Sequence, residues 1–142
     1  MGDRASPGGV PRGWRAFLLL AAVDAAAAGG WLAARPGDLL ALLGLPTSDD
    51  ALLLGRLLGL LWLGHAPALV LAAVRRARYG GLVWLPLLGR VLAVGLWLWL
   101  LGTDRVQVPR LPLVGLIAHD AVWLPGLLGF LWSVRRDCRQ GP

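Results

Sequence analysis

Four predominantly apolar stretches, each about as long as a bilayer is thick, dominate this sequence of 142 residues. A helix crosses the hydrocarbon core with about 20 apolar residues, and runs of that size bounded by charge, Pro or Gly occur four times. The runs lack the alternation of period two that a membrane barrel strand needs. Because lipid cannot satisfy backbone polar groups, we predict that all four are helices. The predicted spans are residues 16–34, 51–74, 82–101 and 111–134.

The composition fits an integral membrane protein better than a soluble domain. Hydrophobic residues make up 57% of the chain and charged residues only 15%, far from the usual soluble balance. We therefore predict an all-α fold, a single four-helix transmembrane bundle at 16–134 between basic tails at 1–15 and 135–142. The net charge is +6, but the arginines flank apolar spans instead of forming a soluble basic face. The expected partner is thus the lipid bilayer and not nucleic acid.

The arginines are shared unequally between the two sides of the predicted bundle. By the positive-inside rule, the side with more arginine is cytoplasmic. We therefore predict that both termini are cytoplasmic, in a plasma (inner) membrane. On the cytoplasmic side lie Arg4, Arg12, Arg15, Arg75, Arg76, Arg78, Arg135, Arg136 and Arg139, and on the opposite side lie Arg35, Arg105 and Arg110.

The first span also has some features of a secretory signal. A basic segment precedes FLLLAAV, and the small residues AAAAGG follow it, as in a cleavable signal peptide. However, Asp24 interrupts the apolar run and the stretch continues to Arg35. We expect a retained helix, with cleavage near Gly29 as the alternative.

A short helix is predicted in the first external loop, within DLLALLGLP. Asp38 can cap it, and Gly44 and Pro46 can end it. Its apolar residues are too few to span a bilayer, so the segment is expected to lie at the outer interface.

Small residues spaced four apart indicate where helices pack closely. On span two, Gly55 and Gly59 form GRLLG, a pattern that allows close backbone approach. The pattern predicts a helix contact inside the bundle, with a dimer face as the alternative, and span one carries a similar stripe. The stripe is Ala22, Ala26, Gly30 and Ala34.

Three charged residues lie near the middle of predicted spans, where charge is expensive. Each ionisable residue at that depth costs roughly 2.5 to 3.5 kcal/mol on insertion scales and is expected to face a partner. From the helical rise, Asp24, Arg90 and Asp120 lie within about 5 Å of one plane. We predict an ion pair of Arg90 with Asp24, Asp120 or both. The cluster could be a purely structural tie or a polar ligand or proton-handling site.

Two histidines, His65 and His119, lie on separate predicted spans. Such a pair can hold haem b, but here the two differ in height by about 9 Å from the helical rise, which is poor for a shared iron. Haem b is therefore the least favoured cofactor. A metal site is not expected either, because adjacent His119 and Asp120 point about 100° apart on a helix.

Two prolines interrupt hydrogen bonding at a similar depth. Pro67 and Pro125 free the carbonyls of Leu63 and Ala121, because proline has no N–H to donate. The kinks would open a small midplane pocket next to the charges. The candidate ligand-binding residues are Asp24 and the residues that would bound this pocket, which are Trp62, His65, Arg90, His119, Asp120 and Trp123.

The order of these features resembles the DoxX-like group of small bacterial four-helix membrane proteins. The matching segments are WLAARPGDLLALLGLP, GRLLGLLWLGH, RRARYGG, LLGR and HDAVW, over about residues 14–136. The resemblance implies a four-helix bundle in which Arg90 and Asp120 occupy the basic and acidic positions that such proteins often show. It also links some relatives to quinone-coupled sulfur oxidation or membrane redox complexes. The bundle has no cysteine, since Cys138 lies in the tail, so thiol chemistry is not implied here.

Together the sequence predicts an accessory, non-catalytic membrane protein. No Ser/His/Asp nucleophile set or phosphate-binding glycine loop is present. The expected ligand is a small amphipathic molecule such as a quinone or a lipid headgroup. The alternatives are a purely structural subunit of a membrane complex, including a homo-oligomer, and a b-haem electron carrier.

Overall fold

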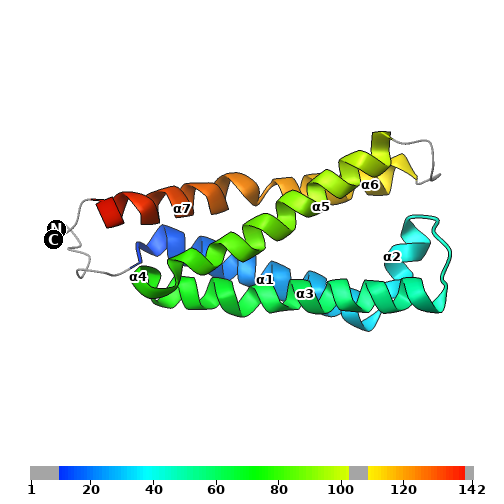
Figure 1. Cartoon of the computed structure of the whole chain (residues 1–142), viewed down its shortest axis with the longest axis horizontal. Coiled ribbons are helices and arrows are strands. Elements are labelled where there is room, and N and C mark those ends of the chain that lie inside the picture. Colours follow the sequence, from blue (N-terminus) through cyan, green and yellow to red (C-terminus); the bar gives the residue numbers. More distant parts are fainter. Residues whose placement is uncertain (1–9, 103–108, 140–142) are drawn as a thin grey trace.

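The computed structural model describes residues 10–102 and 109–139, and this part of the chain is helical with no strand (Figure 1). The prediction of an all-α bundle is therefore confirmed. The elements are α1 (Arg12–Ala34), α2 (Pro36–Leu42), α3 (Asp49–Val74), α4 (Arg76–Tyr79), the 3-10 helix η1 (Gly80–Val83), α5 (Trp84–Gly102), α6 (Arg110–Ala121) and α7 (Leu124–Arg139).

Four helical segments are long and apolar enough to cross a membrane, as predicted. Each is a few residues longer than expected, because charged residues at the ends also adopt helical geometry. The protein is thus a multi-pass membrane protein. The segments are α1, α3, the continuous run Arg76–Gly102 and the run Arg110–Arg136 formed by α6 and α7.

Helices α1 and α3 form the closest pair of the bundle. A side chain at Gly29 would collide with the backbone of Leu63 and Gly59, and one at Gly59 would collide with Ala33. The predicted role of Gly59 in a close helix contact is confirmed. The predicted stripe on α1 was wrong at Gly30, because Gly29 and Ala33 make this contact while a Cβ at Gly30 would meet nothing. Ala22 of the same stripe is buried in the core. The run AAAAGG offers small residues on several faces, so spacing alone could not select one.

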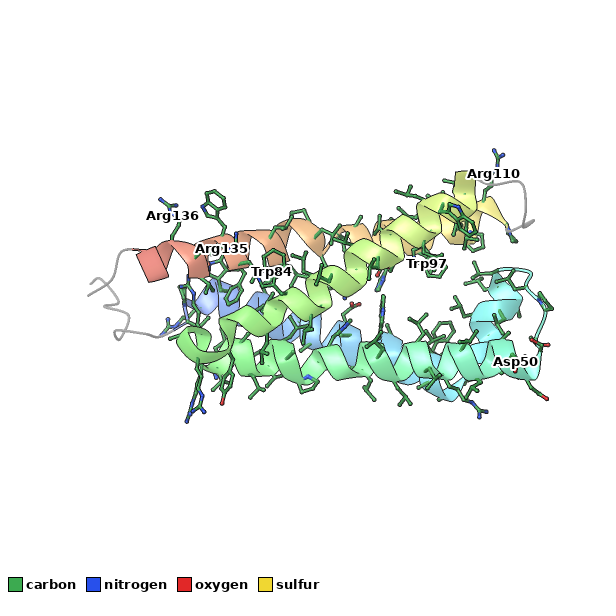
Figure 2. The ribbon with its side chains drawn as sticks, viewed as in Figure 1. Asp50, Trp84, Trp97, Arg110, Arg135 and Arg136 are labelled. Carbon is green, nitrogen blue, oxygen red and sulfur yellow. The ribbon has the colours of Figure 1, made fainter. Side chains whose placement is uncertain are left out.

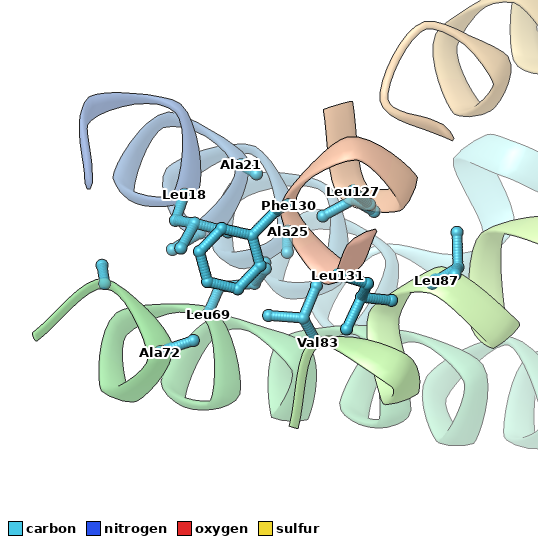
Figure 3. Close-up of a cluster of buried hydrophobic side chains, with 12 residues drawn as sticks. Leu18, Ala21, Ala25, Leu69, Ala72, Val83, Leu87, Leu127, Phe130 and Leu131 are labelled. Atoms are coloured by element: carbon cyan, nitrogen blue, oxygen red, sulfur yellow. The ribbon is translucent and has the colours of Figure 1, made fainter. Parts of the chain in front are cut away.

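One end of the bundle has a well-packed apolar core (Figure 3). Leu18 and Ala21 of α1 meet Leu69 of α3, and Phe130 of α7 fills the centre. Trp14 packs edge-on against Phe130, with ring centroids 5.7 Å apart. Trp14, near the start of α1, is thus partly buried against this core.

At the other end, α2 turns back over the space between the spans. Leu39 and Leu43 are buried with Leu113 and Trp97. Gly44 has a φ of 65° and ends the helix as predicted, while Leu45 donates its backbone N–H to Leu40 in the pattern of a Schellman motif. This short helix therefore contributes apolar side chains to a second core.

Asp38 was predicted to cap α2, and this was wrong. The helix begins two residues earlier at Pro36, whose fixed φ suits the first helical position. Asp38 lies in the first turn and pairs with Arg35 at 2.9 Å.

The two prolines have different effects. Pro67 lies inside α3, which remains helical throughout. At Pro125 the fourth span is broken, because α6 ends at Ala121 and α7 begins at Leu124. The two-residue turn between them contains Trp123, beside the charged residues described next.

Candidate functional site

The charged residues at the middle of the spans form one cluster. Arg90 of α5 contacts Asp24 of α1 through Nη2 at 2.5 Å from Oδ2, and Asp120 of α6 through Nη1 at 3.3 Å from Oδ1. The predicted ion pair is therefore confirmed with both carboxylates. The side chains of Arg90 and Asp120 are 3% and 2% exposed, whereas that of Asp24 is 21% exposed.

His119 joins this cluster from the last turn of α6. Its Nε2 lies 2.9 Å from Oδ1 of Asp24, and its Nδ1 lies 3.4 Å from Oδ1 of Asp120. Its side chain is 39% exposed, in contrast to the neighbouring Asp120, because adjacent helical residues point about 100° apart. We call Asp24, Arg90, His119 and Asp120 the charged cluster.

Two indole rings lie against the guanidinium group. The Cζ atom of Arg90 is 5.3 Å from the ring centroid of Trp62 and 5.4 Å from that of Trp123, within the range of cation–π attraction. Trp62 also stacks on His119 at 6.3 Å between centroids. The structure therefore brings both predicted tryptophans to the charged cluster.

Trp97 belongs to the same site, although the sequence analysis did not select it. Its indole Nε1 donates to Oδ2 of Asp120 at 3.1 Å, so each oxygen of this carboxylate accepts a hydrogen bond. Trp97 follows Arg90 by seven residues, which is two helical turns and hence the same face of α5. That spacing was the available signal, and Figure 2 shows Trp97 on the α5 segment.

His65 is buried but lies apart from these contacts. Its imidazole packs against Gly89, where a Cβ would be 2.5 Å from Cε1 of His65. Among residues 10–102 and 109–136, no hydrogen bond or ion pair joins His65 to the charged cluster. Because Gly89, the residue before Arg90, has no side chain, the imidazole of His65 fits against it.

The arrangement does not fit haem b held by the two histidines. Both ring nitrogens of His119 face carboxylates, and the ring of His65 rests on Gly89. The described part of the chain also contains no group of three or more His, Cys, Asp or Glu side chains placed to hold a metal ion. Arg90 occupies the position between the two aspartates.

A pocket of about 450 Å³ extends from the charged cluster toward α2. Its polar end is formed by His119 and Asp120, with the indoles of Trp62 and Trp97. The rest is apolar. The remaining lining residues are Ala28, Trp31, Leu32, Leu39, Leu58, Leu61, Gly89, Leu92, Ala93, Leu96 and Leu116.

The pocket differs in part from the one predicted. Trp62, His119 and Asp120 line it as expected. His65, Arg90 and Trp123 do not, because Arg90 is buried between the carboxylates and indoles that surround it.

The pocket is open to the apolar surface of the bundle. Leu61 of α3 and Leu92 of α5 line it and are nevertheless 61% and 72% exposed. In a bilayer, such exposed leucines at mid-helix face lipid. A molecule dissolved in the membrane could therefore reach the pocket between α3 and α5 without crossing water.

Comparison with known proteins gives no relative. The chain matches no protein-family model, no curated protein and no solved structure significantly.

Proposed function

We propose that this protein binds a small amphipathic molecule of the membrane, quinone-like or lipid-like, in the pocket between its spans. The observation that carries the proposal is an apolar pocket of about 450 Å³ that ends on His119 and Asp120. Ligand sites are mostly apolar cavities of this size with a few polar groups that fix orientation. The exposed leucines Leu61 and Leu92 at the opening of the pocket support entry of such a ligand from the bilayer.

The role is proposed to be accessory and not catalytic. The groups of the charged cluster are directed mainly at one another, which suits holding a ligand better than attacking one. The resemblance to the DoxX-like group supports the same proposal, since it connects such bundles with quinones and with membrane redox complexes as partners.

The bacterial plasma membrane is the proposed location, with both termini cytoplasmic. Support comes from the positions of the arginines along the bundle. Arg135 and Arg136 lie at one end, and Asp50 and Arg110 lie at the other (Figure 2). Arg75, Arg76 and Arg78 lie in the connection between α3 and α5. From this connection the chain crosses the bundle twice before it reaches Arg135, so these arginines lie at the same end as Arg135.

A pocket-filling variant tests the binding proposal. Ala93 lines the pocket, so Ala93→Phe should block it, whereas Ala118→Phe adds the same ring to an exposed position on α6. The probe is a short-chain benzoquinone, and the readout is quenching of tryptophan fluorescence, because Trp31, Trp62 and Trp97 line the pocket. Native mass spectrometry of the purified protein would identify molecules retained from the membrane.

We expect saturable quenching, or a retained small molecule, in the wild type and in Ala118→Phe but not in Ala93→Phe. Equal binding by all three proteins would place the ligand elsewhere. Loss in both variants would show that added bulk alone is the cause.

A purely structural role is the second candidate, and one observation favours it. Residues from all four spans meet at the charged cluster, with Asp24, Trp62, Arg90 and Asp120 each from a different span. Such a tie could fix helix register without any ligand. Replacing Asp24, Arg90 and Asp120 together by leucine separates the roles, because a scaffold would stay folded and active in its membrane complex.

A further inference from the structure

The polar end of the pocket is rich in hydrogen-bond acceptors. Asp120 lines this end directly, and Asp24 does not line it but contacts the lining residue His119. Their four carboxylate oxygens can each accept about two hydrogen bonds. Four hydrogen bonds reach them from Arg90, Trp97 and His119, one to each oxygen. Acceptor capacity therefore remains on both carboxylates.

Three residues near this end already direct their donors at the carboxylates, and Trp62 presents its ring to Arg90 and His119. Trp97 directs its indole N–H at Asp120, and Arg90 is 3% exposed and does not line the pocket. His119 lines it, but both ring nitrogens face carboxylates. As an imidazolium it directs both N–H groups at them, and as a neutral ring it has only one N–H, which also faces one of them.

The net charge of the charged cluster favours the same kind of ligand. Two carboxylates and one guanidinium leave a formal charge of −1 when His119 is neutral. In that state the charge is uncompensated, which is costly within the bilayer, so the site favours a cationic or donating group over an anion, whereas a protonated His119 makes the cluster neutral.

We infer that the pocket selects amphipathic molecules whose polar end donates hydrogen bonds, such as a hydroquinone or phenol hydroxyl or a protonated amine. Neutral quinones, whose oxygens only accept, and anionic lipid phosphates are then the poorer ligands. The inference rests on the proposed function, because it assigns the head group of the molecule that the same pocket holds.

Matched pairs of small amphiphiles test this selectivity with the full-length protein in nanodiscs. Para-octylphenol and para-octylanisole share a ring and a tail, but the methyl ether lacks the O–H. Octylammonium and octanoate have the same chain length and opposite charge. Binding is measured by isothermal titration calorimetry, with empty nanodiscs subtracted to remove partition into lipid.

We expect the phenol to bind at least about tenfold more tightly than its ether, as a hydrogen bond to a charged acceptor allows. Octylammonium should likewise bind more tightly than octanoate. Phenol binding without ammonium binding would identify a hydroxyl-bearing head group, and the reverse would identify an amine. In Ala93→Phe all saturable binding should be lost, and in Ala118→Phe it should persist.

Two results would overturn the inference. If the ether and the phenol bind equally and both are lost in Ala93→Phe, the pocket is real but does not select donors. If octanoate or the ether binds best, the polar end acts as a donor. The proposed function itself fails in a different way, namely when no amphiphile binds the wild type more strongly than Ala93→Phe.

Asp120→Asn gives an independent measurement where it folds, as judged by circular dichroism. The amide replaces one acceptor oxygen with a donor, so the preference for phenol over ether should shrink severalfold. An unchanged preference would show that Asp120 does not contact the head group. If this variant does not fold, the ligand pairs on the wild type decide the question alone.

Discussion

Trp97 and Asp120 are joined across two helices by a hydrogen bond of 3.1 Å from the indole Nε1 to Oδ2. Since Arg90 binds the other oxygen, this buried carboxylate is held by one neutral and one cationic donor. The pair links the centre of the charged cluster to the wall of the pocket, because both residues also line that pocket.

Trp97→Phe should destabilise the protein by about 1 to 3 kcal/mol, because Oδ2 of buried Asp120 would lose its donor. Trp99→Phe is the matched control, since Trp99 is exposed on the same helix, and should have little effect. Thermal unfolding in detergent, followed by circular dichroism, measures both. Equal losses would mean that the hydrogen bond contributes nothing beyond ring size.

Arg90→Leu should cost about 3 to 5 kcal/mol, because it leaves the buried Asp120 and the partly buried Asp24 without their cation. Replacing all three charges by leucine should recover much of this loss, since apolar packing can substitute for a buried ion network. Denaturant titrations of the single and triple variants measure the difference. A triple variant as unstable as Arg90→Leu would contradict the electrostatic explanation.

Gly59→Ala should destabilise the α1–α3 pair by about 1 to 3 kcal/mol, because the added methyl meets the backbone of Ala33. Gly64→Ala, five residues later in α3, has open space around the new methyl. That control should be neutral or stabilising by up to about 1 kcal/mol, since alanine is the better helix former. Melting temperatures of the two variants should therefore move in opposite directions, and a shift of the same sign would argue against the close contact.

Reporter fusions should place both the connection after Arg78 and the C-terminus in the cytoplasm. The expectation follows from the excess of arginine at that end of the bundle. Alkaline phosphatase, active only outside the cytoplasm, should be active when inserted near Gly44 and inactive at the other two positions. Activity after Arg78 would reverse the orientation.

The large features of the fold were predictable from the sequence because the free energies that determine them, of apolar spans in lipid and of charge at mid-span, are large. Spans of about 20 apolar residues can be recognised by composition alone, and charge at mid-span demands a partner, which led directly to Arg90 with Asp24 and Asp120. The finer packing was not predictable in this way. Gly29 and Gly30 are chemically identical, and only the rotation of α1 against α3 decides which one meets Gly59.

Trp97 shows where the prediction of the site failed. In LWLWL, Trp97 and Trp99 look alike, yet the first is buried and the second is exposed. Counting two turns forward from Arg90 would have separated them, because residues seven apart share a helix face. The pocket itself depends on where Leu39 of α2 and Leu43, just after α2, fold back, which no local pattern specifies.

The ion pair between Asp24 and Arg90 joins residues that are 66 positions apart, and this separation has a consequence for biogenesis. At about 5 to 20 residues per second, a ribosome adds Arg90 about 3 to 13 s after Asp24. The first span is therefore complete, and free to enter the membrane, while its carboxylate still lacks this cation. The apolar block that includes Leu18, Leu19 and Leu20 immediately before Asp24 favours that early insertion, and the arrival of the third span then completes the neutralisation.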